Sequence, residues 1–221
     1  MKTQTAFDKF LIKVNKNFET GSVAVDRGKF VLTFNEATNK LIEYILDKKN
    51  EDDIRYIQKI LISDYPVSPS ESKINYQNFP LPKNYFDFSS ASAIASKEKC
   101  NNKTLFLYEI KGDDKNDILQ DEFNKPSFEA REAPFNITSD NLRVYIDDFA
   151  IDKVMLNYYR YPIQIKLLNE DDPESDFDNN IDPEFDDKFI DRVLSIASGE
   201  FELNVENPKT QADKARAINK I

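Results

Sequence analysis

The sequence predicts an α+β protein in which the N- and C-terminal segments form a helical bundle and an antiparallel β domain is inserted between them. Apolar residues recur with helical spacing at both ends of the 221-residue chain. The middle has short aromatic and β-branched segments separated by proline and turn residues. We therefore expect N-terminal helices over residues 1–65, a β domain over residues 66–168, and a C-terminal helix and tail over residues 180–221, which complete the bundle.

The N-terminal region reads as three helices. The first is expected to be capped by Thr5 and to bury Phe7, Phe10, Leu11 and Val14. The second ends near Lys48-Lys49, where cations suit the negative end of a helix dipole, and its apolar face carries Phe30, Phe34, Ala37, Leu41, Ile42 and Ile45. Asn50 is expected to cap the third helix, with Ile54, Ile57 and Leu61 on its apolar face. Such stripes are typical of core packing rather than of a cofactor site.

Four prolines disfavour helix at the start of the middle region: Pro66, Pro69, Pro80 and Pro82. A small-residue stretch, Ser89–Ser96, follows the first expected strand, Tyr85–Phe88. The residues Ser139-Asp140-Asn141 are expected to form a turn that joins two strands as a hairpin. Asp114–Gln120 is expected to form a short helix between strands. The expected strands are Tyr85–Phe88, Thr104–Ile110, Phe128–Glu132, Pro134–Thr138, Leu142–Ile146 and Val154–Tyr161.

The C-terminal region begins with an acidic run, Glu170–Asp187, that contains no Lys or Arg. We expect Asp182 to cap a helix that starts at Pro183 and turns Phe185, Phe189 and Val193 inward, onto Phe7, Leu11, Leu41 and Ile45. Gly199 and Pro208 interrupt the pattern. The part of the run from Glu170 to Asp178 is expected to be an exposed loop, and the following tail, Lys209–Ile221, is basic. These two segments are expected either to steer neighbouring subunits into register or to be a solvated loop and a frayed terminus.

Composition excludes several function classes. The chain has no histidine and one cysteine, Cys100, so it lacks the Ser-His and Cys-His nucleophile pairs and the usual zinc ligands. Its four glycines form no phosphate-binding loop. We expect no catalytic, cofactor-binding or metal-binding residues, although an enzyme built on carboxylates and a metal stays an alternative. The net charge of −10 disfavours a general nucleic-acid binder. No apolar run approaches the ~20 residues of a membrane span, and Met1-Lys2-Thr3-Gln4 lacks the apolar segment of a secretory signal, so we expect no membrane contact. The single cysteine excludes an internal disulfide, so a reducing cytoplasm is the expected site of folding.

Two local patterns each allow a second interpretation. The run Tyr158-Tyr159-Arg160-Tyr161 could stack nucleic-acid bases, but strand alternation places Tyr159 and Tyr161 opposite Tyr158 and Arg160, which favours packing. Asp176, Asp178 and Asn180 have the spacing that opens a calcium loop. Ile181 stands where that loop needs glycine and Asp187 where it needs glutamate, so an exposed loop is the better interpretation.

Four segments of the chain together resemble ring proteins of crAss-like phages, which are neck and tail components below the portal. The segments are N-F-P-L-P-K-N-Y-F-D-F (Asn78–Phe88), N-K-P-S-F-E-A-R-E-A-P-F (Asn124–Phe135), L-N-Y-Y-R-Y-P (Leu156–Pro162) and I-D-P-E-F-D-D-K-F-I-D (Ile181–Asp191). More loosely, the order of elements is similar to that of head–tail adaptors and tail-tube gatekeepers of short-tailed phages.

The resemblance implies a structural virion protein, not an enzyme, that forms a ring of twelve copies in the portal–tail region. Its partners would be the portal protein and the adjacent ring or tail proteins. Genomic DNA would pass through the lumen without sequence-specific binding, and acidic walls would keep it from sticking. The alternative is a phage assembly or interaction protein that is absent from the particle.

Overall fold

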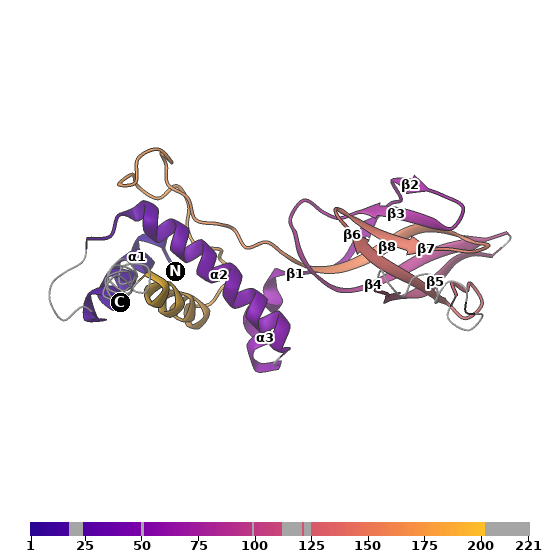
Figure 1. Cartoon of the computed structure of the whole chain (residues 1–221), viewed down its shortest axis with the longest axis horizontal. Helices are drawn as coiled ribbons and strands as arrows, with labels where there is room; N and C mark the ends of the chain where they lie inside the picture. Colours follow the sequence, from indigo (N-terminus) through magenta and orange to yellow (C-terminus); the bar gives the residue numbers. More distant parts are fainter. Residues whose placement is uncertain (18–23, 50, 99, 112–120, 122–124, 202–221) are drawn as a thin grey trace, which may run out of the picture. The chain divides into compact units, whose positions relative to one another are not determined.

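The computed structural model describes residues 1–17, 24–49, 51–98, 100–111, 121 and 125–201 (Figure 1). The chain divides into two compact units. The helical unit comprises Met1–Lys59 and Pro162–Ile221, and the sheet unit comprises Ile60–Tyr161. The expected cap at Asn50, the expected helix Asp114–Gln120 and the basic tail Lys209–Ile221 lie outside the described residues.

The sheet unit contains one eight-stranded sheet with the order β1-β8-β4-β5-β6-β7-β3-β2. The pair β5·β6 is parallel and the other pairs are antiparallel. The strands are β1 (Leu61–Val67), β2 (Glu71–Ser72), β3 (Tyr76–Pro80), β4 (Tyr85–Lys97), β5 (Cys100–Glu109), β6 (Glu132–Thr138), β7 (Asn141–Tyr145) and β8 (Ala150–Arg160).

The sheet curls around a single apolar core to which β1, β3, β4, β5, β6, β7 and β8 all contribute buried side chains. Pro66 is tolerated because β1 is an edge strand, where one row of backbone donors needs no partner. β1 pairs with β8 only from Val154 onward, so Ile151 lies beyond its reach. The buried Gln77 of β3 serves that position instead: its amide oxygen accepts from the Ile151 nitrogen at 2.7 Å and its amide nitrogen donates to the Ile151 oxygen at 3.2 Å. This amide therefore joins strands that are distant in the sheet order.

Several strand predictions are confirmed and others need correction. The Ser139-Asp140 turn does join β6 and β7 as an antiparallel hairpin. Tyr85–Phe88 is only the start of the 13-residue β4, which includes the small residues that follow it. Phe128–Glu132 is not a strand; Phe128 is buried in the core from a turn, and β6 starts at Glu132. β1, β2 and β3 were not predicted.

The helical unit contains α1 (Thr3–Asn17), α2 (Arg27–Lys48), α3 (Glu51–Ile57) and a C-terminal helix over residues 187–201. A short 3₁₀ turn, Gln58–Ile60, follows α3, so Leu61 begins β1 instead of ending a helix as expected. The predicted apolar face of α2 is fully buried, and α2 ends at Lys48 as expected. On α1 three of the four predicted residues are buried, whereas Leu11 is half-buried. α1 begins at Thr3, two residues before the expected cap.

The start of the C-terminal helix was predicted wrongly. The helix begins at residue 187, and the side chain of Asp186 caps it by accepting from the Phe189 nitrogen at 2.8 Å. Asp182 is buried in the preceding turn, where its two carboxylate oxygens accept from the nitrogens of Ile163 and Glu184. Phe185 therefore precedes the helix, although it stacks on Phe189 at 4.3 Å.

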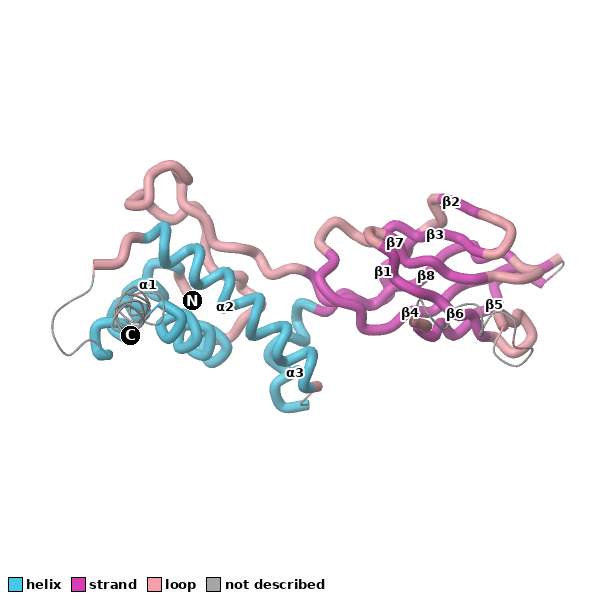
Figure 2. The backbone as a smooth tube through the Cα atoms, in the orientation of Figure 1, coloured by secondary structure: helices cyan, strands magenta, loops and turns pink. Residues whose placement is uncertain are grey.

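The predicted fold class is wrong. The inserted sheet is mixed rather than antiparallel, and this curled eight-stranded sheet is the largest element of the protein. The terminal segments do not form the expected helical bundle, because residues 162–186 are irregular (Figure 2). Phe177 of this irregular segment packs against Phe7 and Phe30 of the helices, at 5.8 and 5.9 Å. Apolar periodicity predicted the helices, but it carried no information on the loop that packs against them.

Candidate functional site

The residues with the calcium-loop spacing serve another purpose. Asp176 pairs with Arg27 at 3.4 Å, and the backbone nitrogen of Asp178 donates to the Lys166 oxygen. Phe177 between them points into the apolar contact with Phe7 and Phe30. Over the described part of the chain, no three His, Cys, Asp or Glu side chains are grouped so that they could hold a metal ion. The arrangement of these residues is that of a tethered loop.

The aromatic run at the end of β8 is part of the packing. Tyr158 and Tyr159 are both buried. The Tyr158 hydroxyl donates to the Asn84 side chain at 3.0 Å. Burial raises the pKa of both phenols. Tyr161 is more exposed but lies edge-on against Phe86, so the packing interpretation accounts for the run.

A basic groove of about 1040 Å³ runs between α1, α2 and the C-terminal helix. Six cationic and two acidic side chains line it, so it carries a local excess of positive charge on an acidic protein. The cations are Lys9, Lys13, Lys16, Lys40, Lys188 and Arg192, and the acids are Asp191 and Glu200. Its apolar lining includes Ile12 and Tyr44, which are 57% and 53% exposed.

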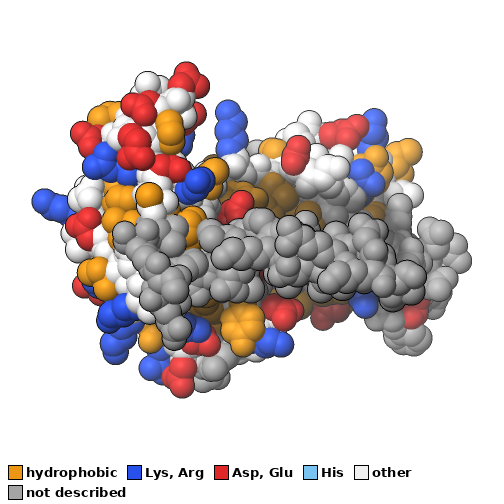
Figure 3. Space-filling model, turned by 60° about the vertical axis from the view of Figure 1, so that its left-hand side comes forward, with side chains coloured by type: hydrophobic (Ala, Val, Ile, Leu, Met, Phe, Trp, Pro, Cys, Tyr) orange, Lys and Arg blue, Asp and Glu red, His pale blue; other side chains and the backbone are white. Residues whose placement is uncertain are grey.

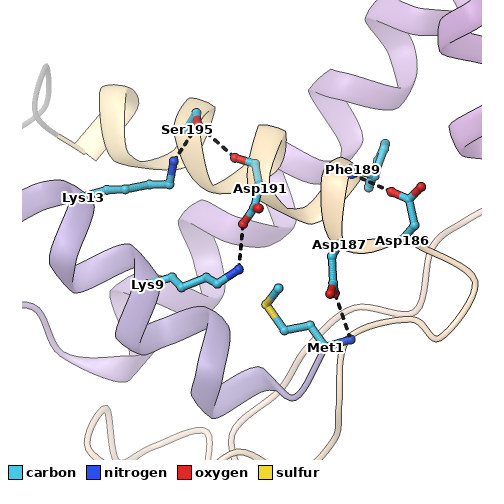
Figure 4. A network of polar contacts seen from close by, with 8 residues as sticks. All are labelled: Met1, Lys9, Lys13, Asp186, Asp187, Phe189, Asp191 and Ser195. Carbon is cyan, nitrogen blue, oxygen red and sulfur yellow. Dashed lines mark hydrogen bonds and ion pairs between the residues drawn. The ribbon is translucent and has the colours of Figure 1, made fainter.

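Polar contacts hold the walls of the basic groove together (Figure 4). Lys9 of α1 pairs with Asp191 at 3.0 Å, and Lys13 donates to the Ser195 hydroxyl at 2.9 Å. Lys40 of α2 pairs with Glu200 at 2.9 Å, which raises the pKa of the lysine. No carboxylate among the described residues forms an ion pair with Lys16 or Lys188. Both acids of the groove are therefore engaged, while these two exposed lysines leave positive charge for a partner.

The second charged surface is the acidic loop, residues 168–178, which has six exposed carboxylates: Glu170, Asp171, Asp172, Glu174, Asp176 and Asp178. Its backbone is held by its own polar side chains, since Asn169, Asp172 and Ser175 accept from the nitrogens of Asp171, Glu174 and Asn169. Its two ends are joined by a hydrogen bond from the Leu168 nitrogen to the Asp176 oxygen at 2.8 Å. These contacts define one conformation for the loop.

The acidic loop is anchored on the start of α2. The Gly28 nitrogen donates to the Pro173 oxygen at 2.9 Å, and a Cβ at position 28 would lie 3.1 Å from the Pro173 Cβ. Glycine thus permits the close approach. Arg27 adds a hydrogen bond to the Glu174 oxygen at 2.7 Å and an ion pair with Asp176. The loop is fixed at its tip as well as at its base.

The extended segment that leads into the acidic loop is tied down by side-chain amides. Asn35 of α2 accepts from the Ile165 nitrogen at 3.1 Å and donates to the Ile165 oxygen at 3.0 Å. Asn179 likewise accepts from the Lys166 nitrogen and donates to the Gln164 oxygen, both at 2.8 Å. These amides substitute for a neighbouring strand. Sequence reasoning missed them because an isolated asparagine gives no signal of its distant partner.

Acidic side chains are most concentrated on one part of the helical unit. In the space-filling view they gather on the loop that projects at the top, whereas the lower side of the unit shows Lys and Arg side chains together with Asp and Glu (Figure 3). The exposure of the carboxylates was predicted and is confirmed. The basic groove was not predicted, although Lys9, Lys13 and Lys16 share one helical face at spacings of four and three residues.

Comparison with known proteins adds no identification: no protein-family model matches the chain, and no curated protein is significantly similar to it. Among the described residues no helix is long and apolar enough to cross a membrane.

Proposed function

We propose that the protein is a structural component of a phage virion, of the crAss-like kind, that forms a ring in the portal–tail region. The ring extends the DNA channel and serves as a platform for the next tail component. The observation that carries the proposal is the set of four sequence segments, spread from Asn78 to Asp191, that together resemble ring proteins of such phages. The resemblance also supplies the number of copies, twelve, and the partners, which are the portal and the adjacent ring or tail proteins.

Two physical features support this proposal. The net charge of −10 suits a conduit, because negative walls repel the phosphates of passing DNA and bind no particular sequence. The charged surfaces of the helical unit are of opposite sign and lie on different elements, as a subunit needs when it contacts unlike faces of its two neighbours. Both features are consistent with a protein that functions by contacting its neighbours.

One observation favours a second candidate, a phage assembly protein that is absent from the particle. The basic groove is large enough for a peptide segment, so an acidic segment of another phage protein could bind there during assembly. Both candidates are non-enzymatic, and they differ in where the protein is found after assembly.

Quantitative mass spectrometry of purified particles tests the proposed function. A ring subunit is expected at a copy number equal to that of the portal protein, and it should stay with the portal and tail after the head has been disrupted. Absence from particles, with the protein present in infected cells, would refute the ring and favour the assembly protein.

A further inference from the structure

We propose that the acidic loop of one copy binds in the basic groove of the next copy and so forms the contact that closes the ring. This inference rests on the proposed function, because it takes a second copy of the chain as the partner. It goes further by naming the two surfaces that meet and the residues that make the contact.

Charge complementarity is the first argument. The basic groove has six cations and two acids, and the acidic loop has six exposed carboxylates and no cation. Both acids of the groove already pair with groove lysines, whereas Lys16 and Lys188 are exposed and pair with no described carboxylate. The loop supplies counter-charge for the two groove lysines that pair with no carboxylate among the described residues.

The apolar surfaces of the two sites also match. Leu168, at the base of the acidic loop, is 66% exposed beside the run of carboxylates. The groove exposes Ile12 and Tyr44 between its lysines. An apolar contact surrounded by ion pairs has the composition of a protein interface, with an apolar centre and a polar rim. A nucleic-acid backbone would use the lysines but would leave Ile12 and Tyr44 without a partner.

The contact must form between copies, because the loop and the groove of one chain face different ways. Lys9, Lys13 and Lys16 line the groove from one side of α1. Leu11 and Asn15, which line a hollow next to Glu174 of the acidic loop, lie more than a quarter turn away around the helix, at ~100° per residue. Figure 1 shows the loop projecting upward from the helical unit. Unlike surfaces that meet between copies form a heterologous contact, which closes into a ring when the rotation permits.

The acidic loop is preorganised for binding. Its side-chain hydrogen bonds, its tie to Gly28 and its Phe177 anchor hold it in one conformation before any partner arrives. A preorganised loop loses little conformational entropy on docking, so more of the contact energy contributes to affinity.

A charge-swap experiment on the purified full-length protein tests the proposal. The groove variant is Lys16→Glu with Lys188→Glu, and the loop variant is Glu170→Lys with Asp171→Lys; the four side chains are exposed. Sedimentation velocity at ~50 mM and ~500 mM salt measures self-association. Each variant alone brings like charges together at every junction. Each is expected to raise the dissociation constant at least about tenfold at low salt. An equimolar mixture of the two pairs opposite charges at every junction and should regain association.

Matched controls change the net charge equally at exposed positions of the sheet unit: Lys83→Glu with Lys153→Glu, and Asp140→Lys with Asp147→Lys. These should associate like the wild type. In a mixture of ¹⁴N- and ¹⁵N-labelled wild-type protein, a carbodiimide should couple carboxylates of the acidic loop to groove lysines in peptides that carry both labels. Leu168→Ser should weaken the association that persists at high salt.

The outcomes separate this inference from the proposed function. A wild-type protein that shows no association and no mixed-label coupling overturns the docking, and so does a mixture that fails to regain association. Duplex DNA binding that the groove variant abolishes, with self-association unchanged, would assign the groove to nucleic acid and also overturn it. None of these results changes what quantitative mass spectrometry of purified particles would show. A protein that is present at the portal's copy number but fails the charge swap keeps its proposed function and loses only this contact.

Discussion

Phe189→Ala tests how the helical unit is held together. Phe189 is 0% exposed on the C-terminal helix, and its ring stacks on that of Phe185 with centroids 4.3 Å apart. The substitution removes the transfer free energy of the whole ring, leaves a cavity, and deprives Phe185 of its partner. Phe→Ala at such sites costs about 3–5 kcal/mol, a large part of the 5–15 kcal/mol that stabilises a typical domain.

The assay uses the uneven distribution of chromophores between the units. Every helix that the structure describes lies within residues 1–60 and 187–201, so circular dichroism at 222 nm follows mainly the helical unit. Eight of the ten tyrosines belong to the sheet unit, since only Tyr44 and Tyr56 lie outside Ile60–Tyr161, and the chain has no tryptophan. Near-ultraviolet dichroism of tyrosine therefore follows mainly the sheet.

Phe189→Ala is expected to lower the 222 nm melting midpoint by more than about 10 °C. The matched control is Phe106→Ala on β5, a ring that is 64% exposed, for which a change within about 0.5 kcal/mol is expected. A Phe189→Ala midpoint equal to that of the wild type would show that this ring does not stabilise the unit, and the packing described above would be wrong.

Three further predictions follow from local contacts. Asp186→Ala should cost about 1 kcal/mol as the loss of a helix cap, and Asp182→Ala should cost more, about 1–3 kcal/mol, since it leaves two backbone donors without their acceptor. Urea unfolding followed at 222 nm gives the order, and the reverse order would show that the two hydrogen bonds of Asp182 stabilise the protein less than the cap does. Gln77→Leu should lower the free energy of unfolding of the sheet by about 2–3 kcal/mol in urea monitored by tyrosine dichroism, because the buried backbone of Ile151 loses both partners, and an unchanged value would mean that the amide is not needed there. Burial raises the pKa of Tyr159, so as the pH rises the unfolded chain releases the phenol proton before the folded protein does. The contribution of the protonated Tyr159 to stability is therefore complete below pH ~10 and is lost as the pH rises through the folded pKa. Tyr159→Phe should move the alkaline unfolding midpoint upward, and an unchanged midpoint measured by tyrosinate absorbance would contradict this.

Short-range sequence signals predicted what depends on neighbouring residues. The apolar face of α2 was predicted in full because each residue repeats within one or two turns of the same helix. The β6–β7 hairpin was predicted because its turn residues lie between its strands. The end of α2 at Lys48 follows from the same local logic.

What the sequence could not show depends on distant partners. The parallel pairing of β5 with β6 is set by a long connection, so nothing in either strand reports its direction. Asp182 and Asp186 are both plausible caps, and the choice depends on the Ile163 nitrogen, which draws Asp182 into the turn. Gln77 of β3 joins Ile151 of β8 by side-chain hydrogen bonds, and a single glutamine in a strand gives no signal of so distant a partner.

The candidate site shows the same limit in its charges. The acidic loop is contiguous in sequence, so its exposure was predictable, and its Asx-type turns could have been read from Asn169, Asp172 and Ser175. The basic groove gathers its cations from three helices, and no window of the chain contains more than part of it.

Net charge and local charge support different conclusions for this protein. A total of −10 disfavours broad attraction to nucleic acid, because the long-range field of the whole molecule repels phosphate. At contact range the total matters less, since exposed charges are screened over ~8–10 Å and a partner meets the charges within that distance. A partner in the groove meets lysines beside Ile12 and Tyr44, with Asp191 and Glu200 already paired. In the proposed ring, an acidic subunit can thus repel passing DNA and still bind an acidic loop of its own kind, because the two interactions act over different distances.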